Sequence, residues 1–513
     1  MKNLIKKIFT NAFYQLLAVY ALFIILITCG FFHKFSLHFE IFAIVISVLG
    51  VFIISQKKAE KPTSKKLHYA IFITAFLLIL AFRTIPYINN SVPLGYDAGI
   101  YKYAIEQFSE KGFSAEQWIK VELSPAFLYI TFFLNLFFSS EFIITWLFII
   151  FNLILGITIY FTAKEYFNEK TALIAFLFYA LSSVQFKVFS FLYYKTILAI
   201  ILMLWAFYFL KKEKRILFIA FAALTGAMHL QTFFILFISY LAFSVYNYKN
   251  WKSSLTNSIA ILALASISYI GFFRYAVLPL IQPLAESFVS PGKTPGTFIS
   301  FFSYIFLILP ILPFSIIGFL ALAKRKQFNI VFFWALINII IVLCQFFFYN
   351  RFIIQLDIIL IMLSAFGFSI LIKEKKKFGC IILVFMLVAL AFSTFNESKN
   401  AHSLMSKAEL DFIKTLEQTE ENASIIVLSK EYSPWILAYS KRKTIAPGLF
   451  NENKWSESQW NEFWKAKNKN ETAFLMEIYQ KPIYLYAGAK KFENECFSVN
   501  LSQDIYKIYK YIC

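Results

Sequence analysis

The sequence contains little charge and none of the short motifs that mark common soluble enzymes. Only 15% of its 513 residues are charged, and 29 of them are Asp or Glu. No P-loop, metal-finger spacing, nucleophile elbow or tandem repeat is present. These absences exclude repeat proteins and the familiar soluble enzymes that depend on such motifs.

Hydrophobic residues take the place of the missing charge. They make up 59% of the chain, and 20% of the chain is aromatic. A soluble core of ordinary composition cannot bury that much apolar surface. The composition therefore predicts a polytopic membrane protein.

The formal net charge of +20 is unevenly distributed. Residues 1–396 carry 33 Lys and Arg against 14 Asp and Glu, whereas residues 397–513 carry 16 against 15. The positive excess lies in short loops between apolar segments, which the positive-inside rule assigns to the cytoplasm. Because no basic face remains for a phosphate backbone, no nucleic-acid partner is predicted.

We expect a mainly α fold, a polytopic transmembrane helical bundle, since many segments approach the 20 or so apolar residues that a span requires. About 13 spans are predicted, at residues 14–32, 38–55, 68–87, 141–162, 171–189, 195–210, 216–230, 231–247, 255–275, 298–320, 328–348, 352–372 and 378–395. The basic loops then place the N-terminus in the cytoplasm and the C-terminus outside it. The apolar segment 125–138 would break the charge alternation if it crossed, so we expect a helix that lies in the outer leaflet.

Two domains are predicted. Residues 1–396 form the transmembrane domain, with interfacial helices in its external loop 88–140, and residues 397–513 form a small extracytoplasmic α/β domain. Strand-like runs at 424–428 and 483–486 alternate with helical stretches in this tail. Cys496 and Cys513 form either a disulfide there or two free thiols.

One carboxylate, Asp97, stands just before an amphipathic helix on the predicted outer side. The apolar residues Tyr101, Ala104, Ile105 and Phe108 recur at helical spacing, which predicts an interfacial helix with its apolar stripe at the lipid boundary. A carboxylate in such a place suits general-base catalysis, because burial raises its pKa and a hydroxyl can approach from water. The alternative is a helix cap that accepts backbone N–H bonds, and the two roles are compatible.

The stretch around Asp97 resembles the first external loop of a known superfamily. Gly95-Tyr96-Asp97-Ala98-Gly99-Ile100-Tyr101, then Gly112 and Ser124-Pro125-Ala126-Phe127-Leu128-Tyr129, are similar to this loop in the GT-C glycosyltransferases. These polytopic enzymes include the protein O-mannosyltransferases and the lipid A aminoarabinose transferase, and they take sugars from polyprenyl-phosphate carriers. The resemblance covers roughly residues 68–370 and rests on spacing and hydropathy more than on identities.

The resemblance implies that Asp97 is the catalytic base and that Tyr96 and Tyr101 contact the substrate. It also suggests phosphate contacts for Lys195, His229 and Arg351 on the outer face. Simpler interpretations remain open for each cation: Lys195 reaches the interface from a helix end, and His229 is a hydrogen-bonded turn residue. Arg351 begins a span, where a cation opposes the helix dipole, so its partner is either a lipid phosphate or Asp357.

Cofactors are not expected. The superfamily often has a second acid on its next external loop, where this chain has Tyr193-Tyr194-Lys195-Thr196. We therefore predict a single-base site without a metal. If a divalent metal is used, Asp97 and Glu286 are the best pair of ligands, and the Pro- and Gly-rich loop 276–297 around Glu286 is a candidate lid.

The predicted function is a cell-envelope glycosyltransferase in the membrane. A sugar would pass from a polyprenyl-phosphate donor to a glycan, lipid or protein acceptor outside the cytoplasm, with inversion at the anomeric carbon. Two alternatives remain: a non-catalytic protein with the same architecture, and a transporter or flippase for lipid carriers. The C-terminal stretch around Trp435 lacks the Trp-Asp core of the oligosaccharyltransferase acceptor motif, so Trp435 is predicted to be core.

Overall fold

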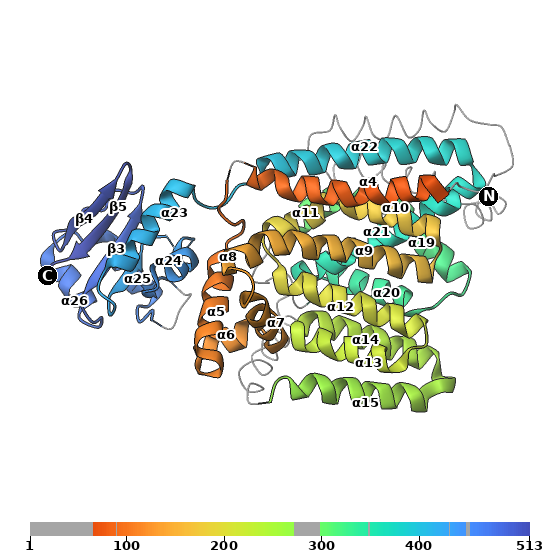
Figure 1. Ribbon diagram of the computed structural model, residues 1–513, viewed down its shortest axis with the longest axis horizontal. Helices are drawn as coiled ribbons and strands as arrows, with labels where there is room; N and C mark the ends of the chain where they lie inside the picture. Colours follow the sequence, from red (N-terminus) through yellow and green to blue (C-terminus); the bar gives the residue numbers. More distant parts are fainter. Residues whose placement is uncertain (1–64, 89, 271–297, 347–348, 430, 448–451) are drawn as a thin grey trace.

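A computed structural model describes residues 65–513, apart from residues 89, 271–297, 347–348, 430 and 448–451. The predicted spans 14–32 and 38–55, and Glu286 with the candidate lid around it, lie outside the described residues. The described chain forms a helical bundle joined to a C-terminal region, residues 401–513, that contains a small sheet (Figure 1).

Within the described residues, five helical segments are long and apolar enough to cross a membrane: Lys65–Tyr87, Ser140–Tyr166, Tyr194–Lys211, Tyr349–Glu374 and Lys376–Asn400. Three bent helix pairs raise this number to as many as eight if each pair is one span. The mainly α membrane architecture is therefore confirmed, whereas the figure of about 13 spans is not.

The bundle helices follow the predicted segments closely. Their bounds are α4 Lys65–Thr84, α9 Phe148–Tyr166, α10 Glu169–Ala180, α11 Ser183–Ser190, α12 Tyr194–Lys211, α13 Arg215–Met228, α14 Leu230–Tyr246, α15 Trp251–Ile267, α18 Phe301–Ile308, α19 Leu312–Lys324, α20 Ile330–Leu343, α21 Tyr349–Glu374 and α22 Lys376–Asn400. Side-chain caps set several starts: Asn168, Ser182, Ser300 and Asn329 each accept a hydrogen bond from the first turn of the helix that follows.

Two predicted spans are broken helices. The segment 171–189 bends by 51° between α10 and α11, and the segment 298–320 bends by 81° between α18 and α19. At the first break Ser182 caps α11. At the second, Pro310 has no N–H to donate to a continuing helix. The prediction that each of these two segments is one continuous helix is therefore wrong.

Helix α21 forms the centre of the bundle, since nearly all of its residues from Phe352 to Gly367 are buried. It meets α19 backbone to backbone: a Cβ added to Gly367 would lie 2.1 Å from the carbonyl oxygen of Phe314. A Cβ on Gly318 would lie equally close, 2.1 Å, to the carbonyl oxygen of Leu363. Small residues thus allow the close helix approach that is common in membrane bundles.

Three shorter helices lie at the end of the bundle that faces the C-terminal region: α5 Ala98–Lys111, α6 Gln117–Glu122 and α7 Pro125–Asn135 (Figure 1). With 11 residues, α7 is too short to span, and it exposes Phe133 and, just past its end, Phe137. The apolar stripe of α5 is buried in protein, where Tyr101 packs on Phe127 at 5.3 Å and Phe108 packs on Phe132 at 6.3 Å between ring centroids. The prediction that this stripe faces lipid is therefore wrong.

The C-terminal region contains a five-stranded sheet in the order β2-β1-β3-β5-β4. Strand β1 is parallel to β2 and β3, and β5 is antiparallel to β3 and β4. The elements are α23 Lys407–Lys414, β1 Ser424–Val427, α24 Ser433–Ser440, β2 Lys443–Ile445, α25 Glu457–Lys465, α26 Lys469–Met476, β3 Ile483–Gly488, β4 Phe497–Gln503 and β5 Tyr506–Tyr511. The two predicted strands are β1 and β3, and Trp435 is fully buried as expected.

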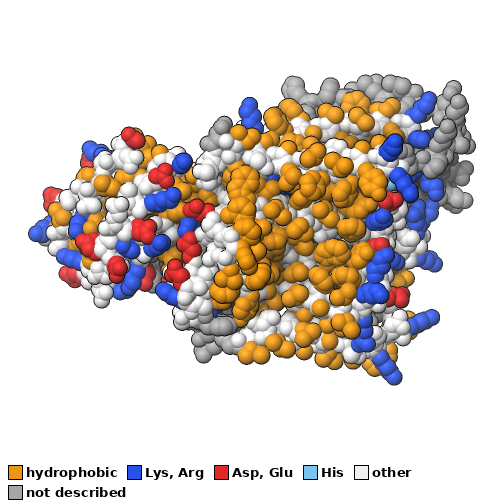
Figure 2. All heavy atoms as spheres, viewed as in Figure 1, with side chains coloured by type: hydrophobic (Ala, Val, Ile, Leu, Met, Phe, Trp, Pro, Cys, Tyr) orange, Lys and Arg blue, Asp and Glu red, His pale blue; other side chains and the backbone are white. Residues whose placement is uncertain are grey.

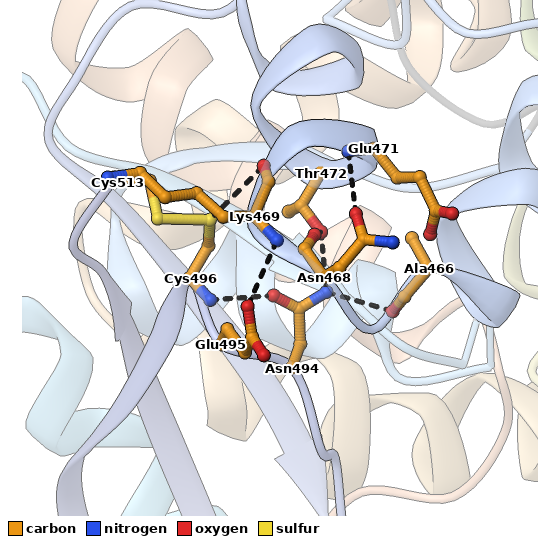
Figure 3. Close-up of a disulfide and its surroundings, with 9 residues drawn as sticks. All are labelled: Ala466, Asn468, Lys469, Glu471, Thr472, Asn494, Glu495, Cys496 and Cys513. Atoms are coloured by element: carbon orange, nitrogen blue, oxygen red, sulfur yellow. Dashed lines mark hydrogen bonds between the residues drawn. A yellow bond between two sulfur atoms is a disulfide. The ribbon is translucent and has the colours of Figure 1, made fainter.

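Cys496 and Cys513 form a disulfide, with their Cα atoms 5.1 Å apart (Figure 3). Asn494 supports it, because its side chain accepts a hydrogen bond from the Cys496 N–H at 2.9 Å and donates to Thr472 at 2.7 Å. The bridge fastens the chain end after β5 to the start of β4. Of the two alternatives for these cysteines, the structure therefore contains the disulfide.

Charge and apolar surface are separated along the molecule. Figure 2 shows hydrophobic side chains over the bundle, with Lys and Arg gathered at the end far from the C-terminal region. The C-terminal region carries both signs of charge. This pattern is typical of a membrane-spanning bundle with one basic end and a separate polar end.

Candidate active site

The loop before α5 lies against the start of α12 because Gly95 permits it. Gly95 has φ +83°, and a Cβ there would lie 3.0 Å from the Cβ of Leu192 and 3.1 Å from the Phe191 backbone. A residue with a side chain would meet both strain and a clash at this point. The glycine therefore brings Asp97 close to the stretch Tyr193–Lys195.

Asp97 occupies the N-cap position of α5, but its carboxylate does not cap the helix. Its main-chain oxygen accepts a hydrogen bond from the Tyr101 N–H at 2.9 Å. The side chain accepts none from the first turn, so the capping interpretation of this carboxylate is wrong.

Two cations from distant parts of the sequence act on Asp97. Lys195, in the first turn of α12, donates a hydrogen bond from Nζ to the main-chain oxygen of Glu122. Arg351, in the first turn of α21, donates from Nη1 to Oε1 of Gln231 at 3.4 Å. The positive charges of both residues are close enough to Asp97 to favour its ionised form.

The pKa of Asp97 reflects opposing effects. Burial raises it above the ordinary value for an aspartate, and this effect is the largest. The positive charges of Lys195 and Arg351 lower it, and the negative charge of Glu122 raises it. The net result is a raised pKa, which suits a base that must take a proton and later release it.

His229 lies in the break between α13 and α14 and is buried. Its Nδ1 shares a hydrogen bond with Oγ1 of Thr232 at 2.8 Å, so the predicted turn hydrogen bond is present. The charges of Lys195 and Arg351 also reach its ring. His229 therefore belongs to the same cluster as the two cations.

Three tyrosines, Tyr96, Tyr101 and Tyr193, lie close enough to Asp97 for its charge to act on their hydroxyls. Tyr101 is buried, and burial together with the charge of Asp97 raises the pKa of its hydroxyl well above the ordinary value. Burial raises the pKa of Tyr193 to about 12 and that of Tyr96 to about 12. These hydroxyls therefore stay protonated at neutral pH and are able to donate hydrogen bonds.

Most of the predicted site residues meet in one place. Asp97, Tyr96, Tyr101, Lys195, His229 and Arg351 all belong to this cluster. Glu286 lies outside the described residues, so its part in a site stays a prediction. Among the residues that the structure describes, no group of three or more His, Cys, Asp and Glu side chains is arranged to hold a metal ion.

Sequence reasoning missed Gln231, Tyr193 and Glu122. Gln231 follows His229 by two residues and could have been suspected from that position, whereas Glu122 is one of several acids in its loop and carries no distinguishing signal. Glu122 is a second acid near Asp97, although it comes from the same external loop rather than from the next one.

Asp357 has partners other than Arg351. Its Oδ2 accepts hydrogen bonds from Ser182 Oγ at 2.9 Å and from Gln185 Nε2 at 2.8 Å. Asp357 also lies six residues after Arg351 in α21, which is about 9 Å along the helix axis at 1.5 Å per residue. The predicted pairing of Arg351 with Asp357 is therefore wrong, and the charge of Arg351 acts on Asp97 instead.

A segment of the chain matches a known family. Residues 124–272, less than half of the chain, match the model of the dolichyl-phosphate-mannose-protein mannosyltransferase family. No curated protein sequence matches the chain.

Solved structures share the fold over most of the chain. The oligosaccharyltransferase AglB from Archaeoglobus fulgidus, in complex with an inhibitory peptide and a dolichol-phosphate, superposes with a TM-score of 0.59 at 15% identity, covering 83% of this chain and 70% of AglB. ArnT from Cupriavidus metallidurans, bound to undecaprenyl phosphate, gives a TM-score of 0.55 at 10% identity, covering 87% of this chain and 98% of ArnT. At 15% and 10% sequence identity, these similarities show a shared fold and nothing more.

Proposed function

The chain has the fold of the GT-C glycosyltransferases, as its sequence predicts, and from this premise we propose that it transfers a sugar from a polyprenyl-phosphate donor to an acceptor outside the cytoplasm. The observation that carries the proposal is the cluster of the Asp97 carboxylate, which does not cap its helix, with the two cations Lys195 and Arg351. Two structures of the same fold contain a polyprenyl-type lipid phosphate, which supports an anionic lipid carrier as the leaving group.

The proposed reaction is a single displacement. Asp97 takes the proton from an acceptor hydroxyl, whose oxygen attacks the anomeric carbon of the sugar. The bond between that carbon and the phosphate oxygen breaks on the opposite face, with inversion, and the lipid phosphate leaves with the bonding electrons. Lys195 and Arg351 stabilise the negative charge of this leaving group, and His229 and the Tyr96 and Tyr101 hydroxyls line the reaction space.

The proposed orientation puts the site and the C-terminal region outside the cytoplasm. Two features support it: the basic end of the bundle lies far from the C-terminal region, and that region contains the Cys496–Cys513 disulfide. The acceptor class that we propose is a glycan, a lipid or a protein of the cell envelope. Metal independence is part of the proposal, since Asp97 acts here as a single base.

The test compares sugar transfer by the wild type and by Asp97→Asn in membranes supplied with radiolabelled polyprenyl-phosphate sugars. Loss of the base is expected to lower the transfer rate about 10²–10⁴-fold. Asp411→Asn makes the same chemical change at an exposed position of α23 and should leave transfer unaltered. Equal transfer by Asp97→Asn and the wild type would refute the base, and no transfer by the wild type from any donor would favour a non-catalytic protein or a lipid-carrier transporter.

A further inference from the structure

The C-terminal region contacts the bundle beside Asp97. Its helix α24 packs against α5, and the two first turns touch backbone to backbone. A Cβ added to Gly99, two residues after Asp97, would lie 2.2 Å from the carbonyl oxygen of Pro434 and 2.7 Å from the Trp435 nitrogen. Only glycine therefore permits the observed approach of the two helices.

Two further contacts flank this point. On one side, the Tyr96 hydroxyl forms a hydrogen bond with the Ser433 side chain. One turn along α5, the nearly buried Lys102 places Nζ 4.8 Å from the centre of the Tyr439 ring. The contact thus runs along both helices and begins at the residue next to Asp97.

Helix α24 is itself held firmly. All eight of its residues, Ser433 to Ser440, are buried, and Trp435 stacks on Tyr439 at 6.0 Å between centroids. It packs on β1, β2 and α23 of the C-terminal region. A displacement of α5 would have to move α24 out of this packed setting, which resists such movement.

We propose that the C-terminal region fixes the position of Asp97 through α24, with Gly99, Ser433 and Pro434 as positioning residues. This inference rests on the proposed role of Asp97 and assigns to the C-terminal region a part in the same site. Precise placement matters because a base displaced by about 1 Å can lose two orders of magnitude in rate. The C-terminal region is then required for transfer even where it does not contact the substrate.

The first experiment does not depend on activity. In a background where Cys29, Cys344 and Cys380 are replaced by Ser, the Asp97→Cys protein is labelled with a membrane-impermeant maleimide. Adding Gly99→Ala should increase the labelling rate severalfold, because the new methyl group separates α5 from α24. Glu110→Ala, on the exposed far end of α5, is the matched control and should leave the rate unchanged.

Because the substituted residue is alanine, the direction of the change in labelling rate shows whether α24 contacts α5. Alanine favours a helix more than glycine does, so Gly99→Ala would make the first turn of α5 firmer if α24 were not in contact with it. Faster labelling therefore reports separation of the two helices. If Gly99→Ala does not fold, Ser433→Ala removes the hydrogen bond to Tyr96 without adding atoms to the contact, and it should increase labelling to a smaller extent.

The second experiment measures transfer in proteins that retain Asp97. Ser433→Ala should lower kcat severalfold while the KM for the lipid-linked donor stays the same, because the phosphate-binding cations are untouched. Unchanged labelling in both Gly99→Ala and Ser433→Ala would overturn the positioning role, whatever the transfer result. Increased labelling without transfer by the wild type would uphold the positioning role and refute the proposed function.

Discussion

At the residue scale, the ionisation of Asp97 is set by groups from three different elements. Burial disfavours the carboxylate, Lys195 and Arg351 favour it, and Glu122 disfavours it. A general base acts only when it is ionised, which requires a pH above its pKa. Because the pKa of Asp97 is raised, transfer should fall as the pH falls through a value above the ordinary one for aspartate.

Substitution of Glu122 tests this assignment. Glu122→Gln removes a negative charge that disfavours the ionised Asp97, so the pKa of Asp97 should fall and the acidic limb of the kcat profile should move to lower pH. Lys195→Met removes a favourable charge and should move the limb to higher pH. The measurement is kcat against pH at saturating donor, with Glu110→Gln as the control on α5. If the acidic limb moved in the same direction in Glu122→Gln and in Lys195→Met, a group other than Asp97 would be responsible for it.

At the element scale, hydropathy predicted where helices lie but not how they bend. The segment 171–189 is uniformly apolar enough to be one span, yet it breaks at Ser182, whose hydroxyl binds the buried carboxylate of Asp357 far along the chain. Such a long-range partner leaves no local signal. The break before α19 was more predictable, since Pro310 and Pro313 stand within the segment.

The contact of α19 with α21 gives a prediction of stability. Gly→Ala inside a helix ordinarily stabilises it by about 0.5–1 kcal/mol, because alanine loses less conformational entropy. At Gly367 the new Cβ would meet the Phe314 carbonyl oxygen at 2.1 Å, and overpacking of this kind costs about 1–3 kcal/mol. Gly367→Ala should therefore lower the Tm of the purified protein in detergent. Ser369→Ala, two residues along the same helix, is the control, and an equal or higher Tm for Gly367→Ala would refute the close packing.

At the scale of the whole molecule, the sequence placed the site residues on one side but could not bring them together. Charge alternation puts Asp97, Lys195, His229 and Arg351 on the same predicted face, and the structure shows that they also form one cluster. No local pattern revealed the contact of α24 with α5. Nothing in the sequence around Gly99 indicates that its backbone lies against Pro434 of a distant segment. Contacts between distant segments depend on packing, which the sequence does not display directly.

The orientation of the molecule yields the last prediction. In the background without Cys29, Cys344 and Cys380, Asp411→Cys places a thiol on the exposed surface of the C-terminal region, and Gln327→Cys places one at the exposed basic end between α19 and α20. A membrane-impermeant maleimide should label the Asp411→Cys protein in intact cells and the Gln327→Cys protein only after permeabilisation. The Cys496–Cys513 pair is oxidised and does not react, so it can stay in place. The reverse pattern would put Asp97 in the cytoplasm, where a disulfide is rarely maintained, and would overturn the proposed direction of transfer.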